Sequence, residues 1–108
     1  MKLLFAIIQD DDVRPLTRAL VEKEISVTRI STTGGFLRGG NSTLMIGVQE
    51  NQLDTALEVI KKNSSSRKSV TVPLAGAAKA GENAAAPMYI TVGGAIVFQV
   101  GVEEFYKF

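Results

Sequence analysis

The sequence predicts an α+β fold in which two helices cover one face of an antiparallel sheet. Two segments place apolar residues at helical spacing, and runs typical of β-strands stand before, between and after them. Their order is strand, helix, strand, strand, helix, strand, which is the βαββαβ arrangement of a ferredoxin-like subunit. A chain of 108 residues has the size of one domain, so we expect a single domain over residues 1–108.

The first strand and the first helix are expected at the amino terminus. Residues 3–8, LLFAII, form a continuous apolar run, which predicts a central strand covered on both faces. Asp11 or Asp12 is expected to cap the helix that follows, and Pro15 is tolerated there only in the first turn. The helical pattern ends near residue 23 or 24.

The next elements are a strand pair and the second helix. A β-branched stretch at residues 25–32 predicts one strand, and residues 43–48 predict the strand that returns beside it. Residues 34–42 then form a short glycine-rich loop at the tip of this antiparallel pair. Asn51 is expected to cap a second helix, because apolar residues at helical spacing follow it.

The last third of the chain predicts two strand regions separated by a long loop. Residues 69–72 form a short strand, and residues 73–87, rich in alanine, glycine and proline, form a long flexible loop. Residues 89–100 form the last strand region, where Gly93 and Gly94 predict a bulge.

Composition excludes several classes of protein. The chain has no cysteine and no histidine, which removes disulfides, thiolate metal sites and Ser-His-Asp catalysis. Twelve basic and eleven acidic side chains give a net charge of +1, without a block of like charge for nucleic acid or a membrane surface. The apolar run at residues 3–8 is too short for a signal sequence or a membrane span, so we expect a cytoplasmic protein.

The segment TTGGFLRGGN at residues 32–41 has two interpretations. A hairpin turn with exposed tip residues is the simpler one. The segment is not a P-loop, because Asn41 stands where the phosphate-binding pattern requires lysine and a strand, not a helix, is expected to follow. The alternative is a nucleotide site, in which backbone amides and Arg38 bind an anion and Phe36 stacks on a base.

The first strand also predicts that copies of the chain assemble. Its two sides are both apolar, with Leu3, Phe5 and Ile7 alternating with the residues between them. The helices cover only one face of the predicted sheet, so something else must cover the other face. Further copies of the same chain are the simplest cover.

Three segments, IIQDDD, TTGGFLRGGN and VGGAIVFQVGVEEFYKF, resemble the PstA-type cyclic di-AMP receptors of the PII-like nitrogen-regulatory-protein superfamily. The resemblance extends over nearly the whole chain and is looser through residues 63–88. It implies a signalling receptor, not an enzyme, whose homotrimer binds the cyclic dinucleotide between subunits. It also implies that the long loop responds to ligand. The alternative is a PII-like interaction protein with altered or lost nucleotide specificity, and a downstream protein partner stays unidentified.

The resemblance further implies which residues contact the nucleotide. Glu24 and Ser26 depart from it, because similar proteins usually carry asparagine and arginine there. Asp10 to Asp12 are explained by a helix cap and a solvated loop, so no metal site is expected. Two of the implied contacts also have a purely structural alternative. Phe98 would then be a core residue, and Thr28 would be an ordinary strand residue. The implied contacts are Thr28, Gly35, Phe36, Leu37, Arg38, Asn41, Gly47 and Phe98.

Overall fold

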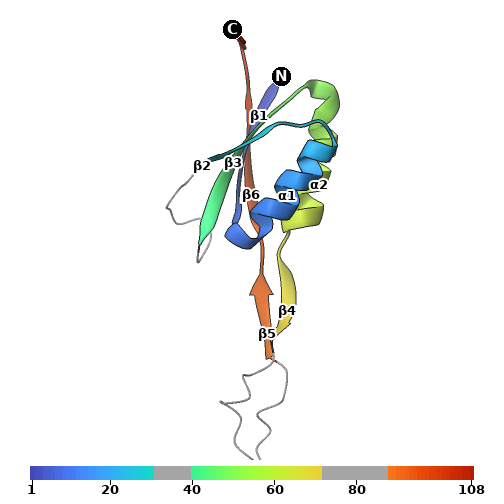
Figure 1. Ribbon diagram of the computed structural model, residues 1–108, viewed down its shortest axis with the longest axis vertical. Coiled ribbons are helices and arrows are strands. Elements are labelled where there is room, and N and C mark those ends of the chain that lie inside the picture. The colour runs from blue at the N-terminus through green and yellow to red at the C-terminus, as the bar shows by residue number, and fades with distance from the viewer. Residues whose placement is uncertain (31–39, 72–87) are drawn as a thin grey trace, which may run out of the picture.

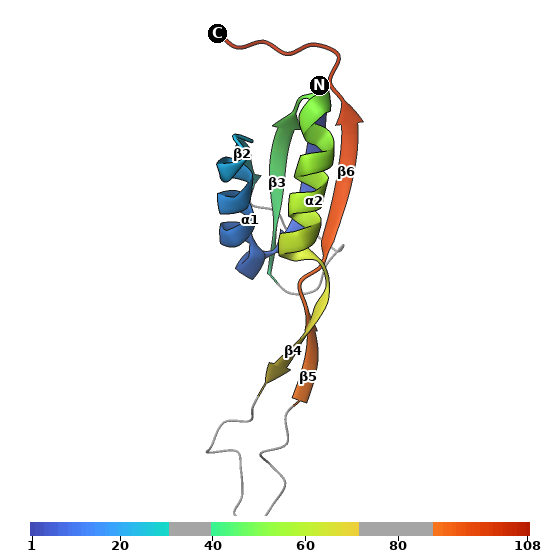
Figure 2. The same cartoon turned by 90° about the vertical axis from the view of Figure 1, so that its right-hand side faces the viewer.

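A computed structural model describes residues 1–30, 40–71 and 88–108, and it confirms the α+β prediction. A four-stranded antiparallel sheet has the order β2-β3-β1-β6, and the two helices lie side by side on one of its faces (Figures 1 and 2). A second sheet of two strands, β4 and β5, extends away from this body. The elements are β1 Lys2–Gln9, α1 Asp10–Glu22, β2 Val27–Ile30, β3 Asn41–Val48, the 3-10 turn η1 Glu50–Gln52, α2 Leu53–Ser64, β4 Arg67–Thr71, β5 Met88–Val92 and β6 Ala95–Gly101.

Strand β1 lies between β3 and β6, as its continuous apolar run predicts. Leu4, Ala6 and Ile8 point to the helices and are fully buried. They pack with buried residues of both helices, including Leu20 of α1 and Ile60 of α2. Neither helix among the described residues has the length and apolar character needed to cross a membrane.

The expected aspartate cap of α1 is wrong. The helix begins at Asp10, directly after β1, and its N-cap residue Gln9 makes no side-chain capping hydrogen bond. Asp12 is only 3% exposed and accepts a 2.7 Å hydrogen bond from Nη2 of Arg67 in β4. This hydrogen bond raises the pKa of Arg67. Asp12 therefore ties the second sheet to α1, and its place in the first turn also suits the helix dipole.

The predicted bulge at Gly93 and Gly94 is also wrong, because these residues join strands of two different sheets. Both have positive φ, 77° and 107°. The amide of Gly93 donates to Oε1 of Gln9 at 2.8 Å. A Cβ atom on Gly93 would clash with Nη1 of Arg67 and would lie 2.8 Å from the carbonyl oxygen of Ser65. Glycine is therefore required where the chain passes from β5 to β6.

Several other boundaries differ from the expectation, including the start of β2 at Val27 in place of residue 25. Asn51 does not cap α2, because a 3-10 turn precedes that helix and Gln49 and Gln52 cap the turn reciprocally. Strand β3 begins at Asn41, inside the segment expected as a loop. Strand β4 begins at Arg67, two residues before the expected start, because it pairs with β5. Most of the loops expected at residues 34–42 and 73–87 lies outside the described residues.

Helix α1 ends in a Schellman motif centred on Glu24. The amide of Ile25 donates to the carbonyl of Leu20 at 3.0 Å, and the amide of Glu24 donates to the carbonyl of Val21 at 2.9 Å. Glu24 has a φ of 60°, the left-handed conformation that glycine or asparagine usually adopts at this position. Ile25 and Leu20 are both buried, which adds the apolar contact typical of the motif.

We expect Glu24→Gly to raise the free energy of unfolding by about 1 kcal/mol, since a left-handed conformation costs about 1–2 kcal/mol for most residues other than glycine. Part of that gain is offset by the greater freedom of glycine in the unfolded chain. Glu58→Gly is the control, because Glu58 is exposed inside α2 and glycine there should lower stability by about 1 kcal/mol. Urea unfolding at one protein concentration measures both. If Glu24→Gly were less stable than the unaltered protein, the left-handed conformation of Glu24 would not be strained.

Candidate functional site

The sheet face opposite the helices is apolar and open. The register of the strands places residues of all four strands in one row across it. Phe98 and Val100 on β6 are 45% and 44% exposed, although both are large apolar residues. Exposed apolar residues gathered on one sheet face are typical of a surface that binds another molecule. The row consists of Thr28, Met45, Phe5 and Phe98.

A cavity of about 430 Å³ lies on this open face. Two of the expected contacts, Thr28 and Gly47, line it together, and Ser26 is their neighbour there. Apart from its chain neighbours, the one described atom within 4 Å of a Cβ on Gly47 would be Cε of Met1, at 3.6 Å, so glycine at this position leaves the cavity open. The full lining is Met1, Leu3, Ser26, Thr28, Met45, Gly47, Val102 and Phe105.

The other expected contacts fall into two groups. Phe98 shares the row of Thr28 but lies on β6, at the opposite edge of the sheet, and it does not line the cavity. Asn41 begins β3 and pairs with Gln9, at the far end of the strand from Gly47. The group formed by Gly35, Phe36, Leu37 and Arg38 lies outside the described residues.

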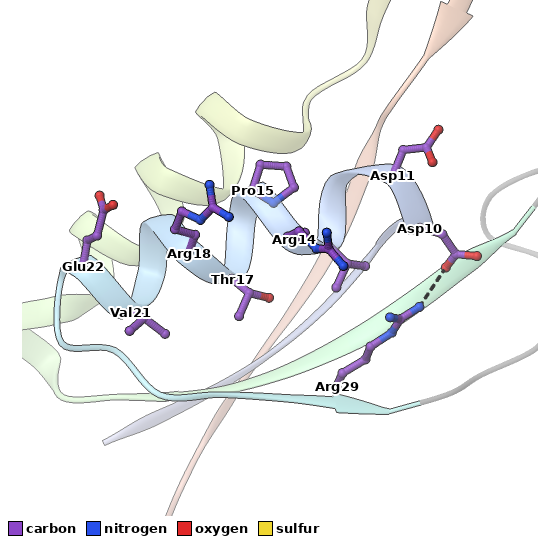
Figure 3. A pocket seen from close by; sticks show the side chains of 10 residues that line it. Asp10, Asp11, Arg14, Pro15, Thr17, Arg18, Val21, Glu22 and Arg29 are labelled. Atoms are coloured by element: carbon purple, nitrogen blue, oxygen red, sulfur yellow. Dashed lines mark ion pairs between the residues drawn. The ribbon is translucent and has the colours of Figure 1, made fainter.

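A polar network holds the two strand ends that flank residues 31–39. Oγ of Ser42 donates to Oδ1 of Asp10 at 2.6 Å and accepts hydrogen bonds from Arg29, the shorter of them 2.9 Å from Nη2. Nη2 of Arg29 also lies 3.5 Å from Oδ1 of Asp10, the ion pair drawn in Figure 3. The amide of Asp10 donates to the carbonyl of Gly40 at 3.1 Å. The end of β2 and the start of β3 are therefore fixed to the first turn of α1.

A larger hollow of about 890 Å³ lies along α1 and is shown in Figure 3. Its lining contains three arginines, Arg14, Arg18 and Arg29, and three carboxylates, so their charges cancel. Of the expected contacts that the structure describes, none lines this hollow. The cavity on the open sheet face, which Thr28 and Gly47 line, is therefore the better candidate.

Sequence analysis did not identify five residues that line this cavity. Alternation along β1 could have identified Leu3, because it lies on the same side of the strand as Phe5 and pairs with Gly47. Met45 could have been found in the same way, as the partner of Thr28. The remaining three, Met1, Val102 and Phe105, come from the two ends of the chain, and no periodic pattern connects them.

Two comparisons relate the chain to known proteins. A sequence model of the family described as cyclic-di-AMP receptor matches residues 1–108. The chain is also similar to a functionally unknown protein from Pediococcus pentosaceus whose crystal structure has been solved. That protein is 37% identical, the match covers 99% of this chain and 96% of the other, and the TM-score is 0.81. All residues that line the sheet-face cavity lie within the family match.

Proposed function

Because the chain belongs to the cyclic-di-AMP receptor family, we propose that it is a non-catalytic receptor that binds cyclic di-AMP between the subunits of a homotrimer. The cavity on the open sheet face carries this proposal, because Thr28 and Gly47 meet there among apolar residues. Its volume of about 430 Å³ is within the range of about 300–1,000 Å³ found for small-molecule sites. Its described lining has no carboxylate side chain that could act as a general base.

The positions of Thr28 and Phe98 support a site shared between subunits. They lie on β2 and β6, the two edges of a four-stranded sheet, so at about 4.8 Å per strand they are about 14 Å apart. Phe98 also stays 45% exposed in the single subunit. A second copy that brings its β6 beside β2 would join the two halves of the site and cover apolar surface at the same time.

We expect cyclic di-AMP to raise the melting temperature of the protein, whereas ATP and cyclic di-GMP should not. A ligand present at 100 times its Kd stabilises the folded state by about 2.7 kcal/mol. The measurement is a thermal-shift panel, followed by calorimetric titration with the nucleotide that gives a shift. Chromatography of the incubated mixtures should show cyclic di-AMP unchanged, and protein-dependent hydrolysis would contradict the receptor assignment.

The alternative is a PII-like interaction protein whose nucleotide specificity has changed or been lost. One observation favours this alternative: the described residues that line the cavity include no charged side chain. The family resemblance also implies that similar proteins usually carry arginine at the position of Ser26. The same panel separates the two functions. A shift with a different nucleotide would indicate altered specificity, and no shift with any nucleotide would favour an interaction protein.

A further inference from the structure

The chain continues beyond β6 as a segment rich in aromatic residues, with no helix or strand, over residues 102–108. Figure 2 shows this segment leaving β6 and crossing beyond the ends of the other strands, toward the side of the sheet where β2 lies. Phe105 lines the cavity together with Ser26 and Thr28, although β6 and β2 are opposite edges of the sheet. The segment after β6 therefore reaches the candidate nucleotide site from the far side of the sheet.

The start of this segment is fixed to the fold. The amide of Val102 donates to the carbonyl of Met1 at 3.1 Å, which extends the pairing of β1 and β6 by one hydrogen bond beyond Gly101. Both Val102 and Met1 line the cavity themselves. The strand ladder thus fixes the chain three residues before Phe105, at the edge of the cavity.

The three aromatic residues of the segment have different surroundings. The rings of Tyr106 and Phe108 stack on each other, with centroids 6.3 Å apart and an interplanar angle of 9°. The hydroxyl of Tyr106 donates to the carboxylate of Glu104. Phe105 faces the cavity but is 63% exposed, so the subunit itself covers little of its ring. An aromatic ring held at a cavity and left largely uncovered offers a flat surface to a ligand.

We propose that Phe105 supplies the surface on which one adenine ring of cyclic di-AMP packs, an inference that rests on the proposed function. The side chains around the ring suit the base better than the phosphates, because the described lining carries no charged side chain. The rest of the described lining is apolar or hydroxyl-bearing, which suits an uncharged purine.

Phe105→Ala should weaken cyclic di-AMP binding about 5- to 150-fold, the equivalent of about 1–3 kcal/mol for one stacked base. The melting temperature without ligand should stay unchanged, because the ring is largely exposed. Phe108→Ala is the matched control, since Phe108 is a fully exposed phenylalanine of the same segment that does not line the cavity. Calorimetric titration of both variants and the unaltered protein measures the difference.

A fluorescence experiment tests direct contact. The chain has no tryptophan, so Phe105→Trp introduces a single indole at the cavity and Phe108→Trp introduces one outside it. Cyclic di-AMP should quench and shift the emission of Phe105→Trp and leave that of Phe108→Trp nearly unchanged. Phe105→Trp should also keep most of the affinity that Phe105→Ala loses, because it retains an aromatic face.

The outcomes separate this role from the proposed function. If the unaltered protein binds cyclic di-AMP and Phe105→Ala binds it equally well, the role of Phe105 is overturned and the receptor function stands. Equal losses in Phe105→Ala and Phe108→Ala would overturn it as well, because the effect would then belong to the whole segment. If the unaltered protein binds no cyclic di-AMP, the proposed function fails first, and the role of Phe105 fails with it.

Discussion

Replacing Val100 by aspartate should convert the assembled protein into folded monomers. Val100 lies on the open sheet face, where it pairs with Leu3, and it is 44% exposed in the single subunit. If copies of the chain cover this face, each subunit of the variant would bury an unpaired carboxylate, at a cost on the order of several kcal/mol per charge. The fold itself should persist, because Val100 is not part of the buried core between sheet and helices.

Val21→Asp is the matched control for this variant. It makes the same substitution at a valine that is 59% exposed on α1 and lines the hollow along that helix, not the open sheet face (Figure 3). Sedimentation equilibrium over a range of concentrations should show a trimer for the unaltered protein and for Val21→Asp, and a monomer for Val100→Asp. If Val100→Asp were still a trimer, the interface between subunits would not lie on the open sheet face. If the unaltered protein were a monomer, the homotrimer proposal would be wrong.

The same variant also tests whether the nucleotide site is shared. Thr28 and Phe98 lie at opposite edges of one sheet, and we expect the Phe98 that completes the site at Thr28 to come from a second subunit. Monomeric Val100→Asp should therefore bind cyclic di-AMP much more weakly than the control. Tight binding by the monomer would show that the cavity of one subunit is sufficient.

The central part of the fold could be predicted because its signals are local and periodic. Residues 3–8 are apolar on both sides, which predicted a central strand. Together with two helices that cover only one face, the same pattern predicted a second apolar face that the subunit leaves uncovered. Both faces of β1 are apolar in the structure, with Leu4, Ala6 and Ile8 under the helices and Phe5 on the open side. Thr28 and Gly47, which entered through family resemblance, meet at one cavity because β2 and β3 pair.

The remaining features depend on contacts between distant parts of the chain. Asp12 looked like a local helix cap, yet its partner Arg67 is 55 residues away. The role of Gly93 depends on Gln9 and Arg67 as its neighbours, which no local pattern contains. Phe105 reaches the cavity only because β6 pairs with β1 and carries the following segment across the sheet. These features follow from tertiary pairing and not from the spacing of residue types.

The structure also separates the two departures from the family pattern. Glu24 lies in the Schellman motif with positive φ and does not line the cavity. Asparagine tolerates the left-handed conformation better than most residues, so its presence in similar proteins has a conformational explanation at this position. Ser26, by contrast, lines the cavity beside Thr28. Only the departure at Ser26 is therefore expected to act directly on the nucleotide.

Ser26→Arg should tighten cyclic di-AMP binding by about 10- to 100-fold. The described lining of the cavity has no charged side chain, whereas the ligand carries two negative phosphates. A hydrogen bond to a charged group contributes about 1.5–3 kcal/mol, and each 1.4 kcal/mol changes the affinity tenfold. Ser26 is exposed, so an arginine fits there without repacking of the core. Calorimetric titration at two salt concentrations gives the affinity and its electrostatic part.

Ser66→Arg is the control for the added charge, because Ser66 is an exposed serine between α2 and β4 and does not line this cavity. If the new arginine contacts a phosphate, Ser26→Arg should bind more tightly than Ser66→Arg at both salt concentrations. Salt screens a distant surface charge more strongly than it screens a direct contact shielded from water. If high salt abolished the gain in affinity of Ser26→Arg, the gain would come from long-range attraction alone. Equal affinities of the two variants would contradict the contact at residue 26. The phosphates would then depend on donors elsewhere, with Arg38 the first to replace.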